Sequence, residues 1–196
     1  MTAADPLRPD LARELLARAA HATEYWSRRI RNELSAVHLD QGRHQDHVNT
    51  NILRRIMAAD GWPGHRLVGP EAARAVWLIA LHADHNPDFQ RTAARLMHRA
   101  VQASDATVGQ WAHLHDRALL NSGQFQEFGS QYRPGGDRVE PCPVREACAL
   151  DTRRAGVGLP PAAVALAALR ERLAAPDHQA DAADDTIVFT ALADAA

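Results

Sequence analysis

The sequence predicts an all-α fold, organised as a single-domain bundle of about seven helices with one long loop or small hairpin that contains glycine and proline. Apolar residues recur at spacings of three and four in one segment after another, which is the period of a helix face. Glycine and proline gather between residues 124 and 143, which predicts a loop with little regular structure. The length of 196 residues suits one hydrophobic core. We therefore expect one helical domain over residues 1–175 and a flexible tail, rich in Ala and Asp, over residues 176–196.

The expected helices begin and end at recognisable cap and stop signals. Asp10 is a suitable N-cap for the first helix, Gly61 ends the second, and Pro70 begins the third. Asn86-Pro87-Asp88 is a cap followed by a first turn, and it opens the fourth helix. Asn121-Ser122-Gly123 ends the fifth. In order, the helices are expected at residues 11–37, 46–59, 70–81, 87–101, 108–119, 144–154 and 161–174.

Two segments stand out from the general pattern. The stretch from Ala75 to Leu81 is apolar all round, which is typical of a helix covered by neighbours on every side, so the third helix is expected at the centre of the bundle. In the loop after the fifth helix, the residues Pro134-Gly135-Gly136-Asp137 are able to turn a short hairpin.

The charge and hydropathy of the chain argue against nucleic-acid and membrane partners. The 22 basic and 24 acidic residues are interspersed and leave a formal charge of −2, so there is no basic face for nucleic acid. The longest apolar run, residues 75–83, is far shorter than the roughly 20 residues that a bilayer span needs. The first ten residues lack the apolar segment of a signal peptide. We expect a cytoplasmic protein.

The cysteine and lysine content excludes several kinds of chemistry. Cys142 and Cys148 are too few for a disulfide framework and lack metal-site spacing, so both are expected to be reduced thiols. The sequence contains no lysine, and this absence excludes a lysine Schiff base, a P-loop lysine and a Ser-Lys dyad.

Histidines cluster at two places. His82 and His85 are three residues apart at the end of the third helix, so they can share a face, and Asp84 lies between them. His113 and His115 are two apart on the fifth helix and cannot face one site. Two histidines and a third ligand from another helix are enough for a metal site with an open position, but no His-Glu-x-x-His is present. We favour the alternative, in which these are capping and surface histidines, and expect neither a metal nor another cofactor.

Charged side chains also lie within apolar segments. Asp116-Arg117 and Arg153-Arg154 are either structural ion pairs or, in the case of the arginines, clamps for a carboxylate or phosphate group. The segment from Gln124 to Tyr132 combines amides, aromatics and a glycine, and it is either a functional loop or a lid packed on the core.

A set of motifs resembles a known family. In chain order they are Asp46-x-x-Asn49, Gly61-Trp62-Pro63, Val68-Gly69, His82-Ala83-Asp84, Phe89-Gln90, Asp116-Arg117, Gln126-x-x-Gly129-Ser130-Gln131, and Asp151-x-Arg153-Arg154-Ala155-Gly156-x-Gly158-Leu159. This string, over roughly residues 46–159, resembles a bacterial family of single-domain proteins known only as a domain of unknown function. Leu81 stands where the family pattern has glutamine, Phe128 where it has tyrosine and Ser130 where it has threonine. The resemblance implies where a site lies and supplies no reaction.

These observations favour a small helical enzyme without a metal, of lyase, cyclase or hydrolase type, which carries out a tailoring step in biosynthesis on a small anionic molecule or a peptide. His82 is the expected general acid or base, and Asp84 or Asp116 orients it. The residues expected to bind the substrate are Gln90, Arg117, Gln126, Gln131, Arg153 and Arg154. The alternative is a non-catalytic module for binding or protein interaction, in which the same ion pairs and amides lock loops onto the helices.

Overall fold

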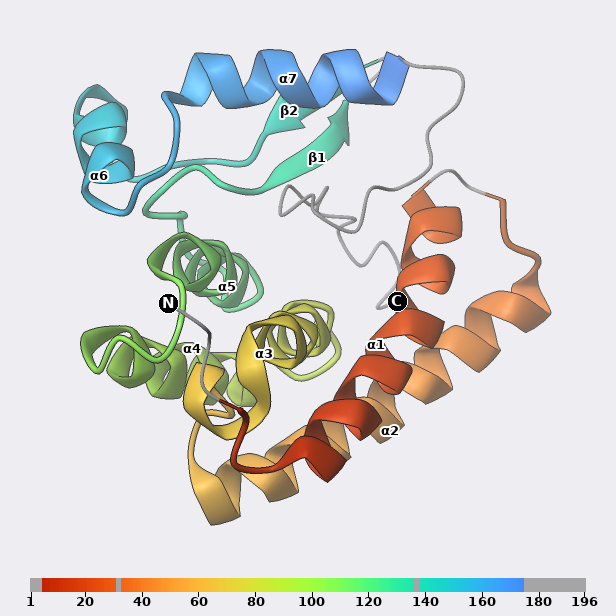
Figure 1. The fold of residues 1–196 in the computed structure, drawn as a ribbon. Helices are drawn as coiled ribbons and strands as arrows, with labels where there is room; N and C mark the ends of the chain where they lie inside the picture. Colours follow the sequence, from red (N-terminus) through yellow and green to blue (C-terminus); the bar gives the residue numbers. More distant parts are fainter. Residues whose placement is uncertain (1–4, 31–32, 136–137, 175–196) are drawn as a thin grey trace. The chain divides into compact units, whose positions relative to one another are not determined.

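The computed structural model describes residues 5–30, 33–135 and 138–174. Within these residues the chain forms seven α-helices, one short 3₁₀ turn and a two-stranded sheet, so the predicted all-α fold is confirmed (Figure 1). The chain divides inside α5 into two compact units, Met1–Leu114 and His115–Ala196. The predicted tail, residues 176–196, lies outside the described residues. In the part of the chain that is described, no helix combines the length and the apolar character that crossing a membrane requires.

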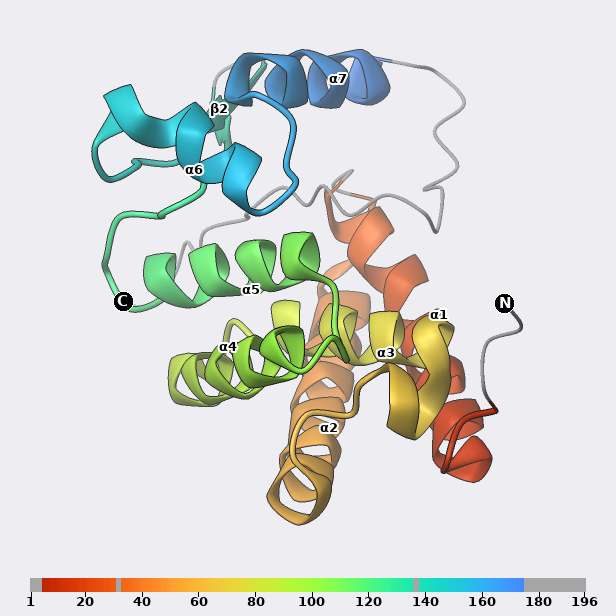
Figure 2. The same ribbon diagram turned by 60° about the vertical axis from the view of Figure 1, so that its left-hand side comes forward.

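The first unit is built around α3. In chain order its helices are α1 (Pro9–Ile30), α2 (Ala36–Asp60), α3 (His65–Leu81), α4 (Pro87–Gln102) and the first part of α5 (Val108–Leu120). Helices α1, α2 and α4 each pack against α3 (Figure 1, Figure 2). Val76, Trp77 and Leu81 of α3 are fully buried, which agrees with the central position expected for this helix.

The boundary between the first two helices was predicted wrongly. The first helix was expected to extend over residues 11–37 and the second to begin only at residue 46. Helix α1 ends at Ile30, and α2 begins at Ala36. Ser35 is the N-cap of α2, and its hydroxyl accepts a hydrogen bond from the His38 N–H. The apolar period continues across this break through Val37, but that side chain is exposed, so periodicity alone gave the wrong boundary.

Helix α3 contains a sharp change of direction near its start. Gly69 has φ 80° and ψ 164°, values that are not helical, and Pro70 follows it. A positive φ favours glycine because a Cβ atom would clash with the backbone. The regular helix therefore begins at Pro70, as predicted, and the preceding turn, residues 65–68, is added to it.

Asp105 accepts hydrogen bonds from two backbone N–H groups at the start of α3. Its backbone carbonyl accepts from the His65 N–H at 2.9 Å, and its carboxylate accepts from the Arg66 N–H at 2.7 Å. The chain at Gly64 passes so close that an added Cβ would lie 2.3 Å from the Asp105 carbonyl oxygen.

Gly64→Ala is therefore expected to destabilise the protein by about 2 kcal/mol, since overpacking forces the backbone apart. Urea unfolding followed by circular dichroism measures the change. Gly156→Ala is the matched control, because nothing lies within 4 Å of the Cβ that it adds. Equal stability of the two variants would contradict the prediction.

The second unit joins a hairpin to two short helices. Strands β1 (Tyr132–Gly135) and β2 (Arg138–Pro141) are antiparallel, with Tyr132 opposite Pro141, so the small hairpin that was predicted is present. A 3₁₀ turn (Ala147–Ala149) leads into α6 (Leu150–Gly156), and α7 (Ala162–Ala174) follows and lies along the hairpin (Figure 1, Figure 2). Tyr132, Val139 and Leu169 form the buried cluster between hairpin and α7.

The helix predicted over residues 144–154 begins later than expected. Val144 pairs with Gln126 in an isolated parallel bridge, and the Gln126 N–H donates to the Pro143 carbonyl oxygen at 3.1 Å. These extended contacts hold residues 143–145 out of a helix, so α6 proper starts only at Leu150.

Candidate active site

The predicted site residues fall into two groups, one in each unit. His82, Asp84 and Gln90 belong to the first unit, and Asp116, Arg117, Gln126, Gln131, Arg153 and Arg154 belong to the second. In the first unit Gln90 contacts Asp84 while His82 packs on Trp26, and in the second unit the residues meet at one loop.

In the first unit, His82 and a buried carboxyl share one indole ring. The Nε1–H of Trp26, on α1, donates to Asp46 Oδ1, on α2, at 3.0 Å. The imidazole of His82, the C-cap residue of α3, stacks on the same indole with ring centroids 3.8 Å apart and planes 8° apart. Three helices thus bring an imidazole and a carboxyl to the face and the edge of one aromatic ring.

The Asp46 carboxyl is set to exchange a proton near neutral pH. The residue is 7% exposed. Burial raises the pKa of Asp46 to about 7, and although the Trp26 hydrogen bond and the charge of Arg29 lower this pKa, the negative charge of Asp84 raises it. A carboxyl with such a pKa is present in both protonation states at physiological pH.

His85 packs against a second imidazole beside this group. Its ring centroid lies 3.8 Å from that of the exposed His47. Burial lowers the pKa of His85 to about 4, and the charges of His47 and Arg54 lower it further, whereas Asp84 raises it. His85 is therefore a neutral imidazole at pH 7 and carries no positive charge into the site.

Gln90 fixes the end of α3 and the position of Asp84. This fully buried amide donates from Nε2 to the carbonyl oxygen of Leu81 at 2.9 Å, to that of Ala80 at 3.3 Å and to Asp84 Oδ1 at 3.2 Å. It thereby satisfies carbonyl groups at the end of the helix that have no partner within it. Asp84 and the neighbouring histidines are half-buried, so they remain accessible to a small molecule.

Two further buried groups lie on the same face of α2 as Asp46. Asn49 and Thr50 follow Asp46 by three and four residues, the spacing that places side chains on one helix face. Among the described residues, Asn49 Nδ2 and Thr50 Oγ1 have no hydrogen-bond partner. Buried polar groups are normally paired, so these two are candidates for contact with a bound molecule.

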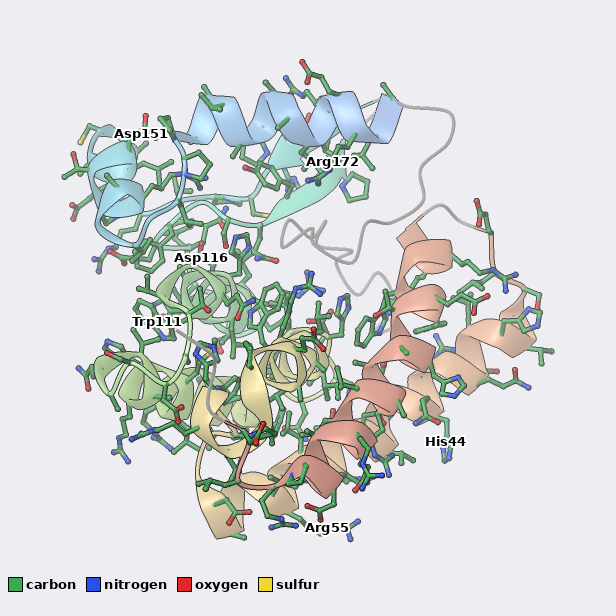
Figure 3. The ribbon with its side chains drawn as sticks, viewed as in Figure 1. His44, Arg55, Trp111, Asp116, Asp151 and Arg172 are labelled. Atoms are coloured by element: carbon green, nitrogen blue, oxygen red, sulfur yellow. The ribbon has the colours of Figure 1, made fainter. Side chains whose placement is uncertain are left out.

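In the second unit, Asp116 organises a loop. This carboxylate projects from α5 (Figure 3) and is fully buried. It accepts from the backbone N–H groups of Glu127 at 2.7 Å, Phe128 at 3.0 Å and Ser130 at 2.9 Å. Burial raises the pKa of Asp116, and the same three N–H groups lower it. Because the hydrogen bonds go to backbone groups, this is the geometry of a structural anchor.

Two arginines of α6 bind the same loop. Arg154 Nη1 donates to the carbonyl oxygens of Phe128 at 2.7 Å and Gly129 at 3.0 Å, and its Nε donates to that of Pro160 at 2.6 Å. Arg153 Nε donates to the Glu127 carbonyl oxygen at 2.8 Å. These guanidinium groups are thus engaged with backbone carbonyls.

The predicted amides complete this loop. Gln126 Nε2 donates to the carbonyl oxygens of Gln131 at 3.1 Å and Cys142 at 2.7 Å, and its Oε1 accepts from the Gln131 N–H at 2.9 Å. Arg117 Nη1 donates to Gln131 Oε1 at 3.3 Å. All six predicted residues of the second unit therefore contact the segment 126–131 or belong to it.

The two histidines considered as metal ligands, His82 and His85, make aromatic contacts. Across residues 5–30, 33–135 and 138–174, no group of three or more His, Cys, Asp or Glu side chains has an arrangement that would hold a metal ion. His82 and His85 instead pack against Trp26 and His47.

Sequence reasoning left Asp46, Trp26, Asn49 and Thr50 outside the candidate site. A signal was present, because Asp46-x-x-Asn49 was one of the motifs and the fully buried Leu53 follows on the same helix face. Polar residues in register with a buried apolar residue indicate a polar group inside the fold. Trp26 carried no such signal, since its role depends on how α1 packs against α2.

Comparison with known proteins supplies the family. Residues 9–174 match the model of a family described as "Family of unknown function (DUF6624)". The chain belongs to this family. The DUF6624 match runs from the first residue of α1 to the last residue of α7, and it confirms the resemblance to an uncharacterised domain family. No curated protein and no solved structure matches the chain.

Proposed function

We propose that the protein is a small helical enzyme that uses acid–base chemistry, and that the Asp46, His82 and Asp84 side chains of the first unit carry it. The observation that supports this proposal most directly is the buried Asp46 carboxyl, which has a pKa of about 7 and shares the Trp26 indole with a half-buried imidazole. General acids and bases work best when their pKa lies near the operating pH.

The proposed roles follow from the contacts. Asp46 takes up or releases a proton near neutral pH, and His82, held flat against Trp26, exchanges the second proton. Asp84, fixed by Gln90, orients the imidazoles beside it. The Asn49 amide and the Thr50 hydroxyl donate hydrogen bonds to the polar group of the substrate on which the proton transfer acts.

The substrate proposed is a small anionic molecule or a peptide, and the step is a lyase, cyclase or hydrolase reaction of biosynthetic tailoring in the bacterial cytoplasm. A cytoplasmic setting agrees with two free cysteines, Cys142 and Cys148. In this proposal Asp116, Arg153 and Arg154 hold the 126–131 loop in shape, as their backbone hydrogen bonds suggest.

The test is a screen of the purified protein against organic acids, their esters and lactones, and short peptides, with mass change read by liquid chromatography and mass spectrometry. We expect turnover of at least one compound, and Asp46→Asn and His82→Gln are each expected to reduce it by about 100-fold or more. Arg55→Gln, an exposed change elsewhere on α2, is the control and should leave turnover unchanged. Turnover that survives in both site variants, or that is absent throughout the screen, would contradict the proposal.

A second candidate function is a non-catalytic binding module. The observation that favours it is that Asp116, Arg154 and Gln126 direct their hydrogen bonds to the backbone. Under this alternative the polar residues stabilise a loop that is recognised by a partner, and Asp46→Asn changes no chemical turnover.

A further inference from the structure

A hollow of about 480 Å³ lies on the first unit between α2 and the beginning of α4. Its lining residues are Arg54, Met57, Ala58, Asn86, Asp88, Phe89, Thr92 and Leu96. The volume lies within the range of about 300–1,000 Å³ that is usual for small-molecule sites. Four of the lining residues are apolar and the other four carry polar side chains, the composition expected of a site for an amphiphilic molecule.

Arg54 brings an uncompensated positive charge to this hollow. Its guanidinium carbon lies 5.7 Å from the centroid of the Phe89 ring, and its Nη1 donates to Asn51 Oδ1 at 2.9 Å. Among the described residues no carboxylate lies within ion-pair distance of it, whereas Arg91 and Arg43 have Asp88 and Asp40 as partners. Stacking on an aromatic ring leaves the edge of a guanidinium, with its N–H groups, available to an anion.

Two neutral hydrogen-bond donors, Asn86 and Thr92, line the hollow together with Arg54. Asn86 Oδ1 caps α4 by accepting from the Phe89 N–H at 3.1 Å, so its Nδ2 group remains available for donation. The Thr92 hydroxyl also lines the hollow. One cation with neutral donors matches a monoanion, and the carboxylate of Asp88 at the same hollow disfavours a dianion such as a phosphate monoester.

The hollow adjoins the proposed acid–base residues along the chain. Asn86 directly follows Asp84 and His85, and Phe89 directly precedes Gln90, which binds Asp84. The charge of Arg54 also contributes to lowering the pKa of His85, so the two side chains lie close enough to interact. Asn86 and Phe89 at the hollow are thus linked through the chain to Asp84, His85 and Gln90 of the proposed site.

We propose that this hollow binds the substrate as a small organic monocarboxylate, with its carboxylate on Arg54 and Asn86 and its aromatic or aliphatic body on Phe89, Met57 and Leu96. The inference rests on the proposed function for the identity of the reacting residues, and it adds the substrate class. If the hollow is the substrate site, binding depends on the negative charge of the ligand and on the Arg54 side chain. It also depends on the volume of the hollow being unfilled.

The experiment is a fluorine NMR titration of the full chain with 4-fluorophenylacetate, compared with the neutral 4-fluorophenylacetamide. We expect the carboxylate to bind the wild type and the amide to bind roughly tenfold more weakly, since only the carboxylate makes a charge-assisted bond to Arg54. Arg54→Gln should weaken binding of the carboxylate by about tenfold, and Thr92→Trp, which fills the hollow, should abolish it. Arg55→Gln removes the same charge from the neighbouring position of α2 and should change the affinity by less than about twofold.

The outcomes separate this inference from the proposed function. Asp46→Asn should bind the probe as the wild type does, because Asp46 does not line the hollow, even where that variant has lost turnover. Equal binding of carboxylate and amide, equal effects of Arg54→Gln and Arg55→Gln, or absence of binding to the wild type would each overturn the hollow as the substrate site. Each of those results would leave the acid–base proposal to be decided by its own variants. Circular dichroism melts of every variant show that the fold is kept.

Discussion

Asp116→Ala is expected to lower the free energy of unfolding by about 3–5 kcal/mol, the largest stability effect that the structure predicts. The carboxylate is fully buried and accepts from three backbone N–H groups of the loop 127–130. Removing it leaves these donors buried without an acceptor, which costs more free energy than losing an exposed hydrogen bond. Urea unfolding measures the effect.

Asp151→Ala is the matched control for this variant. The Asp151 carboxylate accepts from a single backbone N–H, that of Ala162 at 2.8 Å, and it is exposed. A loss of about 1 kcal/mol or less is expected for it, as for other helix caps. Faster hydrogen exchange at Phe128 and Ser130 should accompany Asp116→Ala and not Asp151→Ala. Similar losses in the two variants would show that the loop does not depend on Asp116.

Asp46→Asn is expected to change the way stability depends on pH. The pKa of Asp46 is raised in the folded state to about 7, against about 3.9 in an unfolded chain. The folded state therefore holds a proton that the unfolded state has released between these pH values, so this group's contribution to stability falls as pH rises from about 4 to about 7. With about 1.4 kcal/mol for each pKa unit and about three units between the folded and unfolded values, the variant should gain on the order of 4 kcal/mol relative to wild type across this interval.

The comparison with the variant isolates this effect from that of His85. The lowered pKa of His85 has the opposite sign: the unfolded imidazole binds a proton below about pH 6.5 while the folded one stays neutral down to about pH 4, so its contribution is lost as pH falls. The wild-type curve contains the effects of both Asp46 and His85. Because His85 is present in both proteins, its effect cancels in the difference between wild type and Asp46→Asn. Parallel curves for the two proteins would show that the Asp46 pKa is not raised.

Some boundaries of the fold were predictable because they depend on local chemistry. The Asn86-Pro87-Asp88 signal predicted the start of α4, and the Asn86 side chain does cap that helix. The break between α1 and α2 was not predictable from periodicity, because apolar residues continue across it. The short Ser35 cap decides that boundary.

In the candidate site, too, the sequence identified some residues but not the contacts that they make. Sequence reasoning singled out Asp116 and Arg154 as buried charged residues, and both are buried. Their partners are backbone groups of the 126–131 loop and of Pro160, which carry no residue-specific signal in a sequence. The cluster around Asp46 was missed for a related reason, since it forms only when Trp26 of another helix donates to that carboxyl.

Arg154 has a consequence for the order in which the chain acquires structure during synthesis. It holds the carbonyl groups of Phe128 and Gly129, which leave the ribosome some 25 residues earlier, together with that of Pro160, which leaves six residues later. Until α6 has emerged, the 126–131 loop is held by Asp116, by Arg117 and by its own amides, without either arginine of α6. A nascent chain that stalls before this arginine would therefore expose Phe128 and unpaired carbonyl groups to chaperones and proteases.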